Sequence, residues 1–356
     1  MTTPPVASVT PATPTSPCRA GIETIDDLRC HLQVALELEH ATIPPYLCAL
    51  YSIPDGSNVT ASGLIRSVAM EEMLHMVLAA NLLNAIGGTP LVNDPSFIPS
   101  YPTYLPNSDD SFVVNLLPFG RDALDTFLLI ERPTPPDAPG DPDKFHTIGE
   151  FYLGILAGFE RLAPTPEAEK ALFCGDPKRQ VTGASWYYGG GGAPIEVHDL
   201  ATAKQAILEI CEQGEGFDHT MYDHDDQFGQ IDELAHYYRF NEICAERRYT
   251  ASDSPLQPPT GDALIVDWSG RYPMGANPKM AEYVNQPEIL TLMTGFNRRY
   301  TALLNSLHDA FNGRPAALMD AVPIMYELKY RAQSLMTIPS GRADGTTAGP
   351  SFEYVA

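Results

Sequence analysis

Apolar residues recur along most of this chain at the three- and four-residue spacing of an α-helix. The first run places Leu28, Leu32, Leu36, Ile43 and Leu47 on one face, the pattern of a helix that packs one side against a core. The same spacing predicts further helices over residues 61–86, 121–131, 146–162, 200–214, 231–248, 287–311 and 315–336. Alternating strand patterns are few, so we predict an all-α protein.

Proline and glycine divide these predicted helices. Pro44-Pro45 lies inside the first run and is expected to kink or interrupt it, because proline lacks a backbone donor and clashes with the preceding turn. Gly87-Gly88 is expected to end the second helix. The Pro-, Asn- and Ser-rich stretch that follows predicts a long irregular crossover. The glycine run at 189–192 lacks the lysine and spacing of a phosphate-binding loop, so we interpret it as a flexible loop.

Ionisable residues interrupt the apolar faces of the predicted helices. Glu39 lies in the stripe of the first helix, and Glu72 with His75 interrupts that of the second. Glu233 and His236 repeat the Glu-x-x-His spacing. A buried unpaired carboxylate is costly, so such groups are usually paired or bind metal. Two Glu-x-x-His helices, each preceded by a helix with a core glutamate, predict a ferritin-like four-helix bundle that holds two divalent metal ions.

The ligand from the remaining helix is left open between two glutamates. Glu212 lies one turn after Leu208 in the helix just before the second Glu-x-x-His, and short connections favour it. Glu150 also lies in a predicted helix after the crossover. Arg239 is expected either to orient a ligand carboxylate or to form a surface ion pair. The competing interpretation of all these residues is solvated carboxylates and hydrogen-bonded core histidines.

Composition narrows the class of protein. The chain has 356 residues and a formal net charge of −23, which disfavours nucleic acid and anionic membranes as partners. Six scattered cysteines without a CxxC pair predict free thiols and a cytoplasmic location. We expect a disordered Pro/Thr-rich leader over residues 1–21, a metal-binding bundle over 22–250, a helical extension packed on it over 251–338 and a loose tail over 339–356.

Several segments resemble a known family. "LELEHATIPPYLCALYSI", "EEMLHMVLAANLLNAIGGTP", "DTFLLIERP", "HTIGEFY", "EQGEG" and "ELAHYYRFNEI" are similar to the ferritin-like domain of the iminophenylpyruvate dimer synthase type. That domain is found in the bisindole pathways to violacein and rebeccamycin and in stand-alone bacterial proteins. The resemblance covers residues 22–250, and the helical region after it is also similar. It implies that Glu39, Glu72, His75, Glu212 and His236 are metal-site positions.

The leading functional hypothesis is a metal-dependent oxidoreductase of specialised metabolism. Two iron ions, or manganese or a mixed pair, would activate O₂ or peroxide and oxidise a small, aromatic, amino-acid-derived substrate. The resemblance implies oxidative coupling of imino acids as the specific reaction. The alternatives are a non-catalytic iron-handling protein and a degenerate scaffold that lost its metal. The sequence leaves open whether the protein forms a homo-oligomer.

Overall fold

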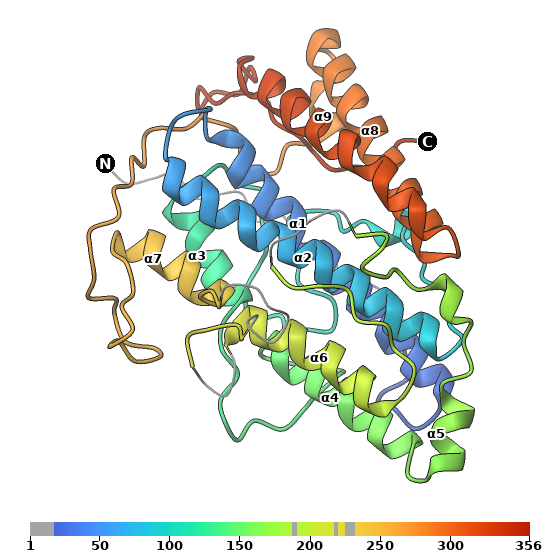
Figure 1. The fold of residues 1–356 in the computed structure, drawn as a ribbon. Helices are drawn as coiled ribbons and strands as arrows, with labels where there is room; N and C mark the ends of the chain where they lie inside the picture. The colour runs from blue at the N-terminus through green and yellow to red at the C-terminus, as the bar shows by residue number, and fades with distance from the viewer. Residues whose placement is uncertain (1–17, 187–190, 217–219, 225–231) are drawn as a thin grey trace.

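The computed structural model describes residues 18–186, 191–216, 220–224 and 232–356. Over these residues the fold is predominantly helical, with only isolated β-bridges between loops. Residues 1–17 of the leader expected over residues 1–21, and residues 189–190 of the glycine run, lie outside the described residues. The all-α prediction is therefore confirmed for the part of the chain that can be described (Figure 1).

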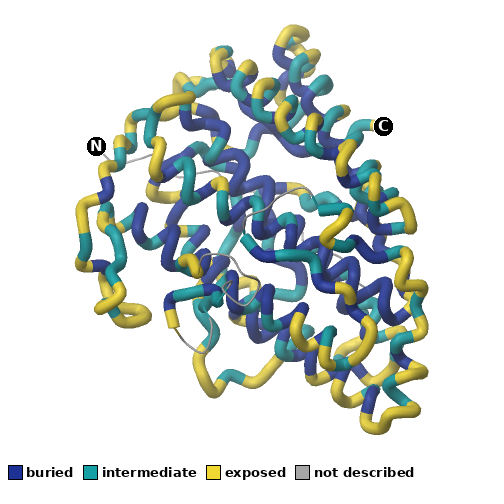
Figure 2. The backbone as a smooth tube through the Cα atoms, viewed as in Figure 1, coloured by how far each residue is buried: buried dark blue, intermediate teal, exposed yellow. Residues whose placement is uncertain are grey.

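Two long antiparallel helices form the centre of the molecule. They are α1, Ile25–Ser52, and α2, Val59–Ala85, and most of their residues are buried (Figure 2). Thr24 begins α1 with a capping box, in which its hydroxyl accepts from the Asp27 amide and the Asp27 carboxylate accepts from the Thr24 amide. The pair supplies two of the four helices of a bundle.

The other two positions of the bundle are each filled by two shorter helices. α3, Arg121–Ile130, and α4, Ile148–Leu162, lie against α1. α6, Leu200–Glu215, and α7, His236–Ala245, lie against α2. Each pair runs antiparallel to the long helix that it contacts, with a loop between its two members (Figure 1). The two helical positions opposite α1 and α2 are therefore each interrupted near the middle of the bundle. A single continuous helix in each position would leave no such gap.

The two prolines do not interrupt α1. The helix continues through Pro44 and Pro45, so of the two predicted effects, a kink or an interruption, the interruption is wrong. Pro45 has no N–H to donate to the carbonyl of Ala41, but the hydroxyl of the buried Tyr101 donates to that carbonyl at 2.8 Å. The crossover loop thus supplies a donor that the helix backbone lacks.

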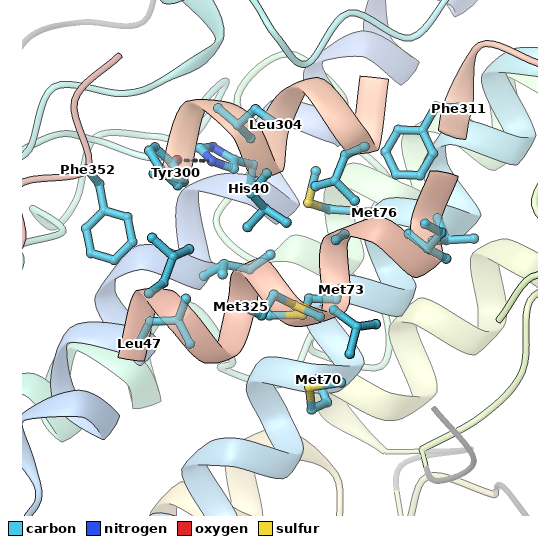
Figure 3. Close-up of a pocket in the computed structure, with 18 of the residues that line it drawn as sticks. His40, Leu47, Met70, Met73, Met76, Tyr300, Leu304, Phe311, Met325 and Phe352 are labelled. Carbon is cyan, nitrogen blue, oxygen red and sulfur yellow. Dashed lines mark hydrogen bonds between the residues drawn. The ribbon is translucent and has the colours of Figure 1, made fainter. Parts of the chain in front are cut away.

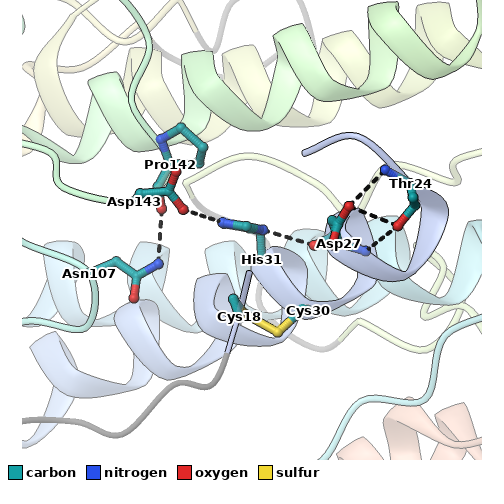
Figure 4. Close-up of a disulfide and its surroundings, with 8 residues drawn as sticks. All are labelled: Cys18, Thr24, Asp27, Cys30, His31, Asn107, Pro142 and Asp143. Atoms are coloured by element: carbon teal, nitrogen blue, oxygen red, sulfur yellow. Dashed lines mark hydrogen bonds and ion pairs between the residues drawn. A yellow bond between two sulfur atoms is a disulfide. The ribbon is translucent and has the colours of Figure 1, made fainter. Parts of the chain in front are cut away.

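The predicted absence of disulfides is also wrong. Cys18 and Cys30 form a disulfide that ties the chain before α1 to the first turns of that helix (Figure 4). On the same helix the buried His31 binds Asp143 of the loop before α4 through Nε2, at 2.9 Å. Two cysteines 12 residues apart, one in an irregular segment and one in a helix, do not by themselves predict a disulfide. The bond depends on the irregular segment packing against the start of α1. The other four cysteines are free.

The C-terminal part packs on the outer face of α1 and α2. Two antiparallel helices, α8, Pro287–Phe311, and α9, Leu318–Met336, lie across that face (Figure 1). The tail is not loose as expected, because Phe352 is buried against Phe296 and Tyr300 of α8. Sequence also missed the short helix α5, Pro166–Leu172. None of the helices within the described ranges has the length and apolar character needed to cross a membrane.

Candidate metal centre

Four of the residues singled out by sequence meet in the interrupted half of the bundle. Glu39 comes from α1, Glu72 and His75 from α2, and His236 from the first turn of α7. Glu131, the residue that ends α3, completes the cluster. Glu39, Glu72 and His75 form one group and Glu72, Glu131 and His236 a second, and in each group the ligand atoms lie within 4.8 Å of one another. All five side chains are buried.

Glu72 is shared by the two groups and lies between the histidines. The Nδ1 atom of His236 is 2.9 Å from Oε1 of Glu72 and 3.4 Å from Oε2 of Glu131. The Nδ1 atom of His75 is 3.4 Å from Oε2 of Glu39 and 3.7 Å from Oε1 of Glu72. The imidazole rings stack with centroids 5.4 Å apart. This arrangement, a bridging carboxylate between two Glu/His pairs, is the ligand chemistry of a dinuclear site.

Both histidines are held from behind through Nε2. That atom of His236 lies 2.9 Å from Oε2 of Glu71, whose other oxygen accepts from Arg239 at 2.7 Å. The Nε2 atom of His75 lies 3.0 Å from Oε1 of Gln213 on α6. Partners at Nε2 fix the ring orientation and leave the Nδ1 lone pair directed into the cluster, as in metal-ligating histidines.

The three carboxylates are anchored in the same way, each by one hydroxyl. Tyr152 donates to Oε1 of Glu39, Tyr46 donates to Oε1 of Glu131, and Thr42 donates to Oε2 of Glu72 at 2.7 Å. In each case the other oxygen is the one that faces a histidine Nδ1. Every ligand side chain therefore has one atom held by the protein and one directed inward.

The charges within the cluster are incompletely balanced. Burial, together with the charge of Glu131, raises the pKa of Glu39 to about 8 and that of Glu72 to about 7. Burial lowers the pKa of His75. Glu71 is different: burial opposes its ionisation, but Arg239 and His236 outweigh this and lower its pKa to about 2. Glu71 thus has its own cation, whereas the three inward carboxylates share only the two imidazoles.

One buried atom shows directly that the donor set suits cations. Nδ1 of His236 makes no hydrogen bond within the described residues, although two carboxylate oxygens lie within 3.4 Å. Burial opposes protonation of His236, but the carboxylates of Glu131, Glu71 and Glu72 outweigh it and raise the pKa of His236. Positive charge is therefore favoured between Nδ1 and these oxygens, and divalent cations would take the place of the proton there, so the residues present fit a dimetal centre.

A cavity of about 320 Å³ reaches the cluster through the gap in the bundle. Glu39, Glu72, His75 and Glu131 contribute to its wall. The ends of the interrupted helices form the rest, with Ile130, Arg132, Ile148, Gly149, Ile210, Cys211, Gly214 and Glu215. Burial raises the pKa of Glu215 to about 7 against the opposing hydrogen bond from the Thr134 amide. The cavity thus holds a carboxyl group that can exchange a proton near neutral pH.

Three glutamates expected at the site lie elsewhere. Glu233 precedes α7, because residues 221–223 and 233–235 pair in extended conformation and delay the helix until His236. Its side chain is 51% exposed and lies 3.3 Å from Arg239. The predicted helical start near residue 231 is therefore wrong, and the helical spacing that joined Glu233 to His236 does not apply.

Glu150 and Glu212 remain outside both groups of ligand atoms that the described residues form. Glu150 caps the start of α4, where its carboxylate accepts from the His146 amide at 2.6 Å. Glu212 is buried in the last turns of α6. Glu131 and Glu71 were not singled out from the sequence. The only signals were that Glu131 closes the predicted helix over residues 121–131 and that Glu71 directly precedes Glu72.

Comparison with known proteins defines the class. A family model described as ferritin-like matches residues 32–245, and the chain belongs to this family. A solved structure of a ferritin-like protein from Caulobacter vibrioides has the same fold, with a TM-score of 0.63 at 21% identity over 93% of this chain and 100% of that one. The predicted fold class is confirmed.

Two curated relatives are more specific. The chain is 28% identical over 404 residues to a dichlorochromopyrrolate synthase of Lentzea aerocolonigenes, which covers 97% of this chain and 38% of that protein. It is 26% identical over 381 residues to a 2-imino-3-(indol-3-yl)propanoate dimerase of Chromobacterium violaceum, at 95% and 34% coverage. The predicted family resemblance is confirmed, and the chain spans little more than a third of the length of either relative.

Proposed function

We propose that this protein is a dimetal oxidoreductase that acts on a small aromatic substrate. Glu39, Glu72 and His75 would hold one metal, and Glu72, Glu131 and His236 would hold the other. The observation that carries this proposal is that every one of these side chains is anchored at one polar atom and directs the other into the cluster. We assign iron as the metal, with manganese or a mixed pair as the alternative.

When bound, the two metals would supply the redox chemistry and the activation of O₂ or peroxide. The residues of the chain hold the site in position. Arg239 and Glu71 orient His236, and Gln213 orients His75. Ile130, Ile148 and Ile210 at the helix ends give the cavity an apolar part of its wall beside the candidate ligands. Glu215 lines the cavity and has a raised pKa, so its carboxyl group can donate a proton to a bound substrate or accept one from it.

The substrate class follows from the relatives and from the cavity. The names of both relatives describe indole- or pyrrole-based compounds, and a cavity lies directly beside the candidate ligands. We therefore propose an amino-acid-derived aromatic substrate in specialised metabolism, with oxidative coupling of imino acids as the specific reaction. The presence of a cavity beside the ligands favours catalysis over iron handling.

Two measurements, made one after the other, test this proposal: the metal content of the protein and its O₂ uptake. Protein reconstituted with Fe²⁺ under anaerobic conditions should bind about two ions per chain, as expected of this class of bundle. On exposure to air it should consume O₂ faster when indole-3-pyruvate and ammonium, which form the imine in situ, are present. A protein that binds metal but shows no substrate-dependent uptake with this or related aromatic imines would be an iron-handling protein. A protein that binds no metal would refute the dimetal site.

A further inference from the structure

A second cavity lies on the opposite side of α1 and α2, beneath the C-terminal helices. It contains about 890 Å³ of empty space, a volume that includes open solvent at its mouth. Its walls come from α1 and α2 on one side and from α8 and α9 on the other, with Phe311 and Phe352 at opposite ends (Figure 3). It shares no lining residue with the cavity at the metal centre.

The lining of this cavity is almost wholly apolar and carries no Asp, Glu, Lys or Arg. Four methionines contribute, Met70, Met73 and Met76 from α2 and Met325 from α9 (Figure 3). Methionine side chains adapt their shape to different apolar surfaces. A charged ligand would be costly to bury here, since nothing in the lining could neutralise it.

Two residues of the lining, His40 and Trp186, each have a buried nitrogen that lacks a hydrogen-bond partner among the described residues. His40, which is 3% exposed, is hydrogen bonded to the Tyr300 hydroxyl through Nε2 (Figure 3), but its Nδ1 makes no such bond within the described part of the chain. The Nε1 atom of Trp186 is likewise unpaired there. Burial lowers the pKa of His40 to about 3, so the imidazole is neutral. The indole N–H can only donate, and leaving it buried and unpaired costs free energy.

We propose that this cavity is a second small-molecule site, which binds a neutral, largely apolar molecule that carries a hydrogen-bond acceptor such as a carbonyl. The apolar walls take the body of the molecule, and the acceptor meets the Trp186 N–H. A second polar atom can pair with Nδ1 of His40. Because α1 and α2 separate this site from the carboxylates, the bound molecule does not contact the metal ligands. Binding at this second site is therefore expected whether or not the metal centre carries out the proposed oxidation.

Nile red is a suitable probe, because it is neutral, aromatic and carries a carbonyl, and its fluorescence rises in apolar surroundings. The full-length protein should bind it saturably. Val322→Phe, on the α9 wall of the cavity, should weaken binding at least about tenfold by filling the space. Met319→Phe is the matched control, because Met319 lies on the same helix but is 45% exposed and does not line the cavity. Metal content should be equal in all three proteins.

Trp186→Phe tests the polar contact separately. It keeps an aromatic ring but removes the N–H, so Nile red should bind about threefold to tenfold more weakly, the usual net worth of one hydrogen bond. Pyrene, which has no acceptor, should bind the variant as it binds wild type. Equal loss for both probes would refute the acceptor contact.

Two other results would overturn the site itself. Nile red binding that is as tight in Val322→Phe as in Met319→Phe would place the dye elsewhere on the protein. The molecular mass of the protein in solution should also be followed as its concentration is raised. If Nile red fluorescence disappears while the molecular mass increases, the occupant of the cavity is a second copy of the chain.

Discussion

The sharpest test of the metal centre compares Glu131 with Glu233. Sequence spacing assigned Glu233 to the site and overlooked Glu131, whereas in the structure Glu131 is 5% exposed and Glu233 lies outside the cluster with a 51% exposed side chain. Glu131→Gln and Glu233→Gln are matched changes, because each removes one negative charge and preserves the shape of the side chain. We expect the first to remove one metal per chain and the second to leave both.

The size of the effect follows from the geometry. Glu131 supplies one of three ligand atoms that lie within 4.8 Å of one another. A carboxylate and a divalent cation about 4 Å apart interact by about 8 kcal/mol at an effective dielectric of about 20. Part of this is offset, because the neutral amide is easier to bury. A net loss of about 3 kcal/mol remains, which corresponds to a fall of roughly 100-fold in affinity at the His236 position.

The assay is metal content per chain by plasma emission spectroscopy after equilibrium dialysis against buffered Fe²⁺. In Glu131→Gln the Tyr46 hydroxyl can still donate to the side-chain amide oxygen, so the local packing should be preserved, and circular dichroism and thermal unfolding check this. The reasoning is refuted if Glu131→Gln retains two tightly bound metals. It is also refuted if Glu233→Gln loses one.

Three further predictions concern stability. In metal-free protein, the free energy of unfolding should fall by about 2 kcal/mol between pH 6.5 and 8, because Glu39 and Glu72 keep protons in the folded state that they lose when unfolded. Urea titrations at several pH values measure this change. A free energy of unfolding that rises over the same pH range would contradict the prediction. Cys30→Ser should cost about 2–3 kcal/mol by releasing the 12-residue loop, with Cys174→Ser, a free exposed thiol, as the control. Tyr101→Phe should cost about 1–2 kcal/mol, since it removes the donor to a carbonyl inside α1; unchanged urea midpoints would show that water replaces the hydroxyl.

Much of the fold and part of the site follow from local pattern. On the long helices α1 and α2, helical spacing places Glu39, Glu72 and His75 on core-facing positions whatever the rest of the chain does, and the structure brings these three together. His236 was singled out through its helical spacing to Glu233, although α7 begins only at His236 and that spacing does not apply. Helical periodicity was therefore sufficient information for the candidate ligands on α1 and α2 alone.

The remaining features depend on where segments stop and what they meet. Glu131 becomes a candidate ligand because α3 ends at that residue, and Glu233 is excluded because pairing between residues 221–223 and 233–235 delays α7. The sequence shows the periodicity of a helix well but its ends poorly, since ends are decided by competing hydrogen bonds from other segments.

Long-range contacts decided the rest. The donor that completes α1 across its prolines comes from Tyr101, about 60 residues away, and the disulfide joins two cysteines that only the folded N-terminal segment brings together. The apolar cavity exists because α8 and α9 pack across α1 and α2. By itself the sequence determined which side chains are costly to bury, because that is a property of each residue and its helical face. Only the tertiary structure decided which of them share a site, because that depends on contacts between residues far apart in the chain.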